Sequence, residues 1–66
     1  MIKCNLSRIM GEKRIKIAEL SRETGLHRNT INLLYNDTAK RIDLDALERI
    51  CKHLDCRIEE LFEIVD

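Results

Sequence analysis

Hydrophobic residues recur at helical spacing along most of this chain. In the stretch 16–36, one stripe falls at the spacing i, i+3, i+4 and i+7 that marks a single face of an α-helix: Ile17, Leu20, Ser21 and Thr24. Gly25 follows, and glycine readily adopts the left-handed conformation that ends many helices. Leu26 is expected to enter the core. The pattern then predicts a second helix over about 28–35 that buries Ile31 and Leu34.

The same spacing predicts three further helices. Asn5 is a good N-cap for a helix that runs to about residue 13 and buries Leu6, Ile9 and Met10. Asp43 should cap a fourth helix, with its inner stripe at Leu44, Leu47, Ile50, Cys51 and Leu54. A fifth helix should begin near residue 58, with its stripe at Ile58, Leu61, Phe62 and Val65. Residues 1–4 read as a short extended arm, so the prediction is an all-α fold of five helices in a single domain, 1–66.

The two central helices and their glycine turn form a helix-turn-helix, a unit that places its second helix in the DNA major groove. If Ile31 and Leu34 face inward, the polar side chains of that helix face outward. Arginine pairs well with guanine, asparagine pairs with adenine, and an exposed leucine can meet a thymine methyl. The candidate base-reading residues are therefore Arg28, Asn29, Asn32 and Leu33.

Basic and polar side chains near this unit are candidates for phosphate contacts, which would position the protein on DNA. They precede the first of the two helices, lie within the second, or follow it in the loop: Lys13, Arg14, Lys16, Thr30, Lys40 and Arg41. His27 stands where serine or threonine would cap the second helix better. It either faces the ligand or is a tolerated surface histidine.

One run of residues resembles a known family. Leu20, Ser21, Gly25, Leu26, Ile31, Leu34, Tyr35 and Asn36 resemble the helix-turn-helix of the XRE family, the phage Cro/CI repressor-like transcriptional regulators. Residues 41–56 and 58–62 are similar to that family's fourth and fifth helices. The resemblance implies a compact five-helix, lambda-repressor-like DNA-binding domain. It also implies a phosphate contact by Asn36, while Asp37 stands where many relatives have glycine.

Charge is divided unevenly along the chain. The 66 residues carry 12 Lys and Arg and 12 Asp and Glu, a formal net charge of zero. Residues 1–41 hold nine bases against four acids, a net +5, and residues 42–66 hold three bases against eight acids, a net −5. The half with the helix-turn-helix is therefore the basic half, as nucleic-acid binding requires. The alternative is that these charges merely solvate a small protein.

Cysteine and histidine do not suggest catalysis or metal binding. Cys4, Cys51 and Cys56 lack the paired spacing of a zinc site, and His53 does not complete one. Neither a phosphate-binding glycine loop nor a nucleophile with its base is recognisable. We therefore expect reduced structural thiols, no metal, no cofactor and no enzymatic activity.

Ile64 and Val65 supply more apolar area than one helix face needs. They predict either a dimer interface or a pairing with the arm at Ile2. The dimer is the favoured interpretation, because two-fold operators require two reading helices about 34 Å apart.

The leading hypothesis is a sequence-specific, double-stranded-DNA-binding regulator, a repressor that forms a homodimer at least on DNA. The alternative is a protein-interaction module, antitoxin-like or adaptor, that keeps the helix-turn-helix as a scaffold. No apolar run reaches the roughly 20 residues of a membrane span, and no signal peptide opens the chain. We expect a cytoplasmic protein with no membrane partner and no small-molecule substrate.

Overall fold

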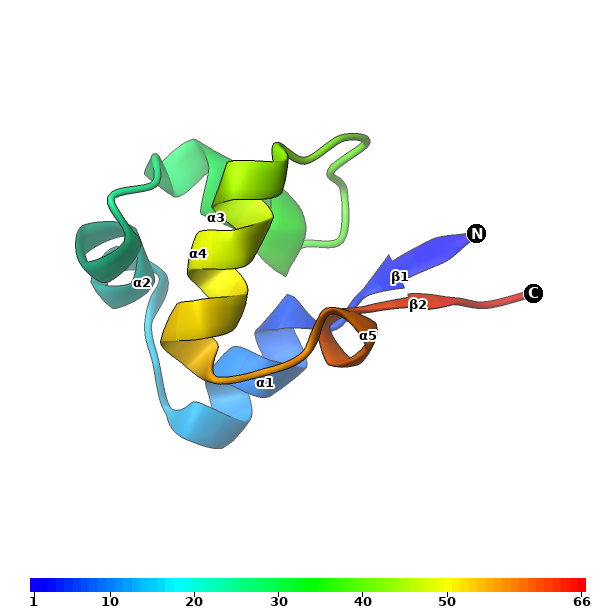
Figure 1. The fold of residues 1–66 in the computed structure, drawn as a ribbon, viewed down its shortest axis with the longest axis horizontal. Coiled ribbons are helices and arrows are strands. Elements are labelled where there is room, and N and C mark those ends of the chain that lie inside the picture. Colours follow the sequence, from blue (N-terminus) through cyan, green and yellow to red (C-terminus); the bar gives the residue numbers. More distant parts are fainter.

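A computed structural model describes all 66 residues as five helices and a two-stranded sheet (Figure 1). In chain order the elements are β1 (Ile2–Cys4), α1 (Leu6–Lys13), α2 (Ile17–Thr24), α3 (Arg28–Tyr35), α4 (Leu44–Leu54), α5 (Ile58–Leu61) and β2 (Phe62–Ile64). The predicted existence and starting points of the five helices are confirmed. The longest helix, α4, has 11 residues, and none of the five combines the length and apolar character needed to cross a membrane.

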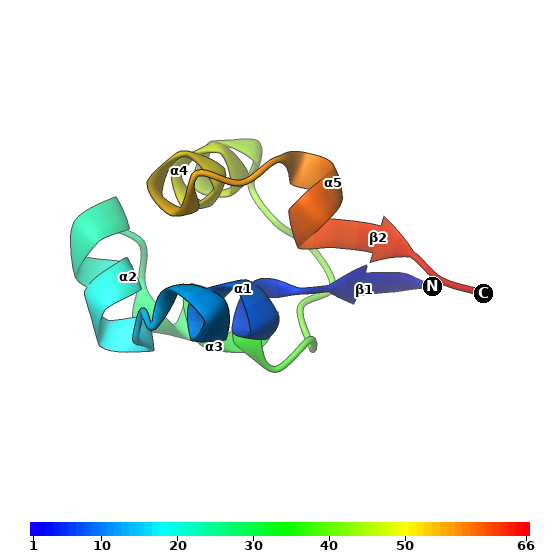
Figure 2. The same ribbon diagram turned by 90° about the horizontal axis from the view of Figure 1, so that it is seen from below.

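The helices form two layers with a closed end and an open end. Figure 2 shows α4 and α5 on one side, α1 and α3 on the other, and α2 closing one end. The strands β1 and β2 project from the opposite end, where the N and C termini lie side by side (Figures 1 and 2). The outer surface of α3 therefore faces away from the layer of α4 and α5.

The core lies between these layers and draws on every helix. Its ten residues are Cys4, Leu6, Ile9, Met10, Leu20, Ile31, Leu34, Ile50, Leu54 and Leu61. The predicted inner faces of α1 and α3 are confirmed, because their apolar positions are the buried ones. On α2, Leu20 and Thr24 of the predicted stripe are buried, whereas Ile17 and Ser21 are half-buried. Leu26 is half-buried and packs against this core, as expected.

The predicted all-α class is wrong at the two ends of the chain. β1 pairs with β2 in antiparallel register, with Ile2 opposite Ile64, Lys3 opposite Glu63 and Cys4 opposite Phe62. The backbone of Phe62 is extended (φ −123°, ψ 140°), so α5 ends at Leu61 and the predicted helical stripe does not reach Val65. Both segments alternate apolar and charged residues, the period of a strand with one buried face. The structure thus shows the pairing with the Ile2 arm, which was the alternative to the favoured dimer interface.

Two predicted positions in the later helices also differ. Leu44 is 79% exposed and Ile58 is 58% exposed, although both were placed on inner stripes. Each is the first residue of its helix and lies beyond the part of the helix that packs against the core. Ala46 is buried in α4 instead, one turn before Ile50.

The residues just before α4 and α1 have different roles. The carboxylate of Asp43 accepts a hydrogen bond from the Asp45 amide at 2.8 Å, which confirms the predicted cap of α4. Asn5 precedes α1 as predicted, but its side chain makes no cap bond. The side-chain Nδ2 of Asn5 donates to the Glu60 carbonyl at 3.3 Å and to the Glu63 carboxylate at 3.1 Å. Asn5 therefore ties α1 to the C-terminal segment.

A cavity-forming substitution should show how much of the stability the core supplies. Leu20 is fully buried between α2 and its neighbours, so Leu20→Ala should lower the free energy of unfolding by about 2–5 kcal/mol. Leu44→Ala removes the same atoms from an exposed site and should change it by less than about 0.5 kcal/mol. Urea denaturation followed by circular dichroism measures both. Equal losses in the two variants would contradict the described core.

Candidate nucleic-acid interface

The turn between α2 and α3 is fixed by local hydrogen bonds. Gly25 has φ 76°, the left-handed conformation that was predicted, and its amide donates to the Ser21 carbonyl at 2.9 Å. The Thr24 hydroxyl donates to the Leu20 carbonyl at 2.6 Å and accepts from the Leu26 amide at 3.3 Å. The Ser21 hydroxyl donates to the Leu26 carbonyl at 2.6 Å. These bonds determine the direction in which the chain enters α3.

His27 begins α3 by acting as its cap. Its Nδ1 accepts a hydrogen bond from the Asn29 amide at 3.1 Å, and its backbone is extended (φ −65°, ψ 140°). A ring nitrogen thus takes the place of the serine or threonine oxygen that normally satisfies the first free amides. The sequence placed His27 at this position as a poorer cap than serine or threonine, and the structure shows that its ring makes the cap bond.

The four candidate base-reading residues form one exposed strip on α3. Arg28, Asn29, Asn32 and Leu33 are all exposed, with Leu33 at 43%, while the opposite face buries the predicted core residues. Arg28 lies one turn before Asn32, and Asn29 lies one turn before Leu33, so the four side chains share a surface. Thr30 lies at the edge of this strip and is half-buried.

The end of α3 is tied to the rest of the protein by two polar side chains. Asn36 is the C-cap of α3, and its side-chain amide donates to the Asn32 carbonyl at 2.9 Å. Asp37 has φ 57°, a left-handed conformation that glycine adopts more easily. Its carboxylate accepts a hydrogen bond from the Cys4 amide at 2.9 Å. No local pattern along the chain signals this link between α3 and β1, because its two residues are 33 positions apart.

The candidate phosphate-binding cations lie in two groups. Lys13, Arg14 and Lys16 occupy the corner between α1 and α2, and Lys40 and Arg41 occupy the loop between α3 and α4. In Figure 1 the corner lies at the bottom, where α1 ends, and the loop leaves the end of α3 at the upper right. The fold therefore places one group of cations directly after the exposed strip and the other group at the far end of α1.

None of the five cations of the corner and the loop forms an ion pair with an acidic side chain. Five of the twelve Lys and Arg residues form ion pairs within the protein: Arg8, Arg22, Arg49, Lys52 and Arg57. The remaining seven are Lys3, Arg28 and the five cations of the corner and the loop. Because unpaired surface cations keep their full charge for a ligand, the positive potential of the molecule is concentrated around α3.

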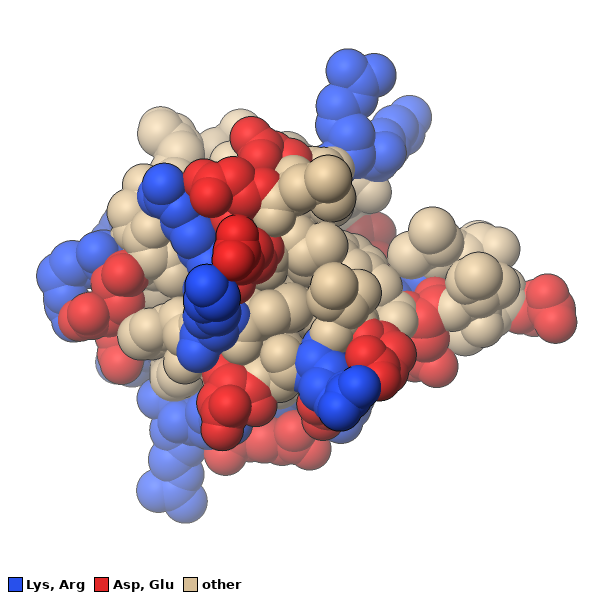
Figure 3. Space-filling view, in the orientation of Figure 1, with Lys and Arg blue, Asp and Glu red and all other residues tan.

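On the opposite face, all three bases of residues 42–66 form ion pairs with nearby acids. Figure 3 views the layer of α4 and α5, where red and blue side chains alternate over the helices and two basic side chains project above the loop between α3 and α4. Asp45 pairs with Arg49 at 3.0 Å and Glu48 with Lys52 at 2.9 Å along α4. The hydrogen bond and charge of Lys52 lower the pKa of Glu48, and hydrogen bonding lowers the pKa of Glu59. These carboxylates therefore stay ionised to a lower pH than an ordinary glutamate does.

The chain matches a described family over nearly its whole length. A model of the Cro/C1-type HTH DNA-binding domain matches residues 5–66, which is every element except β1. The chain belongs to the Cro/C1-type helix-turn-helix DNA-binding domain family. Membership of this family supports a DNA-binding regulator as the class of protein, in agreement with the resemblance described above.

Two relatives of this Cro/C1-type domain agree with the assignment. An uncharacterised HTH-type transcriptional regulator of Bacillus subtilis (strain 168), YozG, is 32% identical over 59 residues, which span 89% of this chain and 70% of that protein. The crystal structure of the transcriptional regulator VanUg (Form II) superposes with a TM-score of 0.78 at 23% identity. That likeness covers 97% of this chain and 84% of the VanUg chain, and it supports the fold.

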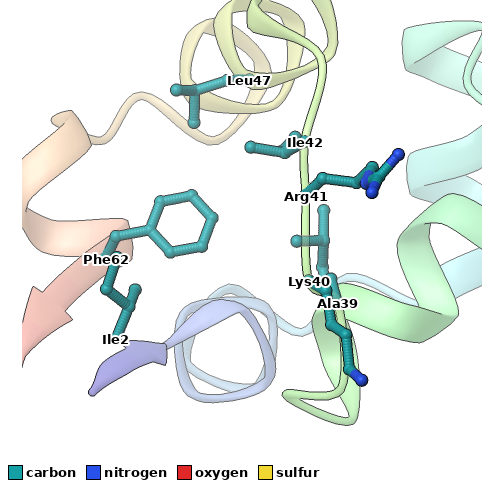
Figure 4. A pocket seen from close by; sticks show the side chains of 8 residues that line it. Ile2, Ala39, Lys40, Arg41, Ile42, Leu47 and Phe62 are labelled. Atoms are coloured by element: carbon teal, nitrogen blue, oxygen red, sulfur yellow. The ribbon is translucent and has the colours of Figure 1, made fainter.

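The Cro/C1-type domain has one cavity, of about 290 Å³, beside the α3–α4 loop. Its lining is mainly apolar and consists of Ile2, Leu34, Ala39, Lys40, Arg41, Ile42, Leu47 and Phe62. Figure 4 shows Ile42, Leu47 and Phe62 around the hollow, whereas the charged ends of Lys40 and Arg41 point away from it. The loop is thus anchored by its apolar residues and presents its cations to solvent.

The thiols of Cys4 and Cys56 are held in the protonated form. Burial, and secondly the neighbouring Cys51, raise the pKa of Cys56 to about 11. Burial also raises the pKa of Cys4, which lies in the core. Reactive cysteines show the opposite shift, toward a lower pKa. The thiols therefore contribute apolar volume, as the sequence predicted for Cys51.

Removing the unusual cap should destabilise α3. His27→Ala deletes the acceptor of the Asn29 amide and should lower the free energy of unfolding by about 1 kcal/mol. His27→Asn supplies a side-chain oxygen at the same place and should retain most of that stability. Urea denaturation of the three proteins at neutral pH makes the comparison. Equal stability of the alanine and asparagine variants would contradict the cap.

Proposed function

We propose that this protein is a sequence-specific transcriptional regulator that reads the major groove with α3 and acts as a repressor. The observation that carries the proposal is the exposed polar strip on α3, which has the unpaired Arg28 at its start and the unpaired Lys40 and Arg41 in the loop that follows it. Its YozG relative and the VanUg structure both bear the description of transcriptional regulators, which supports the same role. Repression follows where the bound site overlaps a promoter and excludes polymerase.

The proposed contacts divide into two classes with different effects. Arg28 donates to guanine O6 and N7, Asn29 and Asn32 pair with adenine, and Leu33 meets a thymine methyl. The phosphate contacts come from residues of the corner, the edge and end of α3, and the loop: Lys13, Arg14, Lys16, Thr30, Asn36, Lys40 and Arg41. Base contacts set which sequence is bound, and phosphate contacts set how strongly any sequence is bound.

Two copies are proposed to bind one operator, because two reading helices give a two-fold site. Ile64 is 80% exposed at the tip of β2 and carries the proposed interface together with Val65. Val65 is half-buried, and its amide donates to the Met1 carbonyl at 2.8 Å. Val65 therefore also stabilises the pairing of the two chain ends. An apolar side chain as exposed as Ile64 is stabilised when a second copy covers it.

Selection of bound sequences from a random duplex pool, at two salt concentrations, tests the function directly. Recovery of a short palindrome is the expected result for a dimeric reader. Affinity should fall steeply with salt, because each neutralised phosphate releases counterions. Enrichment of no sequence, with binding lost at moderate salt, would favour a protein-interaction module instead.

Substitutions in the two contact classes should separate specificity from affinity. Arg28→Ala should relax the preference at one base pair and weaken binding to the selected site by about 1–3 kcal/mol. Lys40→Ala should weaken binding to selected and random duplexes about equally and reduce the salt slope by about 1. Fluorescence anisotropy titrations over a salt series measure both effects. Unchanged preference and affinity in Arg28→Ala would refute the assignment of α3.

The dimer can be tested with two equally exposed apolar residues. Ile64→Asp places a charge at the proposed contact and should abolish dimers on the palindromic site, while the monomer stays folded because Ile64 is 80% exposed. Leu44→Asp changes a residue that is 79% exposed on a different element and should leave dimers intact. Analytical ultracentrifugation with and without the duplex gives the stoichiometry. Dimers that survive Ile64→Asp would exclude this interface.

A further inference from the structure

Arg49 of α4 reaches across to the turn of the helix-turn-helix. Its Nη1 donates a hydrogen bond to the Thr24 carbonyl at 3.2 Å, and its Nε lies 3.0 Å from the Asp45 carboxylate. A Cβ added to Gly25 would lie 3.5 Å from the same Nη1. The guanidinium therefore rests against two consecutive residues at the point where α2 ends.

The Thr24 contact satisfies a group that α2 itself leaves open. The last carbonyls of a helix have no partner within it, and they carry the negative end of the helix dipole. The Ser21 carbonyl is satisfied by the Gly25 amide and the Leu20 carbonyl by the Thr24 hydroxyl. The Thr24 carbonyl receives its hydrogen bond from Arg49, and a cation is the favoured donor at this end.

The Asp45 carboxylate orients the guanidinium for this contact. The two residues lie one turn apart on α4, and Asp45 in turn is held at the start of that helix, where its amide donates to Asp43. An exposed ion pair of this kind adds little stability by itself. The effect of the ion pair here is geometric, because it holds the guanidinium with Nη1 directed at the Thr24 carbonyl of α2.

We propose that Arg49 is a positioning residue for DNA recognition, which clamps the α2–α3 turn to α4 and so fixes the orientation of α3. Arg49 lies on the layer opposite the reading surface and acts through Thr24 and Gly25 rather than on DNA. The inference rests on the proposed reading of bases by α3. Arg49 would then be the residue that holds α3 in a fixed orientation relative to α4.

Loss of this clamp should affect specific binding more than non-specific binding. Base contacts require side chains held within about 0.5 Å of the productive geometry. Phosphate contacts from long, flexible side chains tolerate a small rotation of α3 much better. The ratio of affinities for the selected and a random duplex is therefore the quantity that a positioning residue controls.

The experiment compares Arg49→Met with Lys52→Met at fixed salt. Lys52 lies on the same helix and is paired with Glu48 as Arg49 is with Asp45. It donates no hydrogen bond to α2, whereas Arg49 does. Each substitution thus removes one positive charge and one ion pair on α4, and only the first removes the clamp. Arg49→Met should lower the affinity ratio about tenfold, the loss expected for one charge-assisted hydrogen bond. Lys52→Met should lower it by less than about twofold.

Arg49→Lys and amide hydrogen exchange supply two further readouts. A lysine can donate to the Thr24 carbonyl but cannot be oriented by Asp45 at the same time, so it should restore part of the ratio. In Arg49→Met without DNA, the Gly25 and Leu26 amides should exchange about tenfold faster, while the amides of α4 keep their rates. Measurements well below the melting temperature of each variant keep global unfolding out of the comparison.

The outcomes distinguish this inference from the function on which it rests. If the wild-type protein selects no sequence, the proposed function falls and the positioning role falls with it. If the wild-type protein selects a sequence but Arg49→Met and Lys52→Met give the same affinity ratio, only the positioning role is overturned. A selective loss in Arg49→Met, with partial recovery in Arg49→Lys, supports it.

Discussion

The left-handed turn at Gly25 is the constraint on which the arrangement of α3 depends. Only three residues separate α2 from α3, and the left-handed conformation of Gly25 ends α2 so that the chain can turn within that space. The hydroxyls of Ser21 and Thr24 satisfy backbone carbonyls at this turn. The buried side of α3 is consequently fixed, and its other side must face solvent.

Placement of charge follows from the same arrangement. All three bases of the C-terminal half pair with acids of the same half. Of the nine bases of the N-terminal half, only Arg8 and Arg22 form ion pairs. A chain with zero formal net charge therefore presents an unbalanced positive surface around α3.

The sequence predicted most of this structure, because helical periodicity and caps are local signals. The starts of the five helices, the turn at Gly25 and the exposed strip of α3 were all readable from spacing alone. The sheet was missed because each strand has three residues and Phe62 also fits a helical stripe. The contacts of Asp37 with Cys4 and of Arg49 with Thr24 join residues that are 33 and 25 positions apart, which no periodic pattern encodes.

The pairing of β1 with β2 makes this short chain a closed loop. The Met1 amino group donates to the Val65 carbonyl across 64 positions, and the Asn5 amide donates to the Leu61 carbonyl. Such long-range contacts carry the largest loop-closure entropy in the molecule, and few buried side chains reinforce them beyond Cys4 and Phe62. The two ends should therefore join last during folding and separate first on heating. Because Asp37 connects Cys4 to the end of α3, separation of the ends would also release one support of the reading helix.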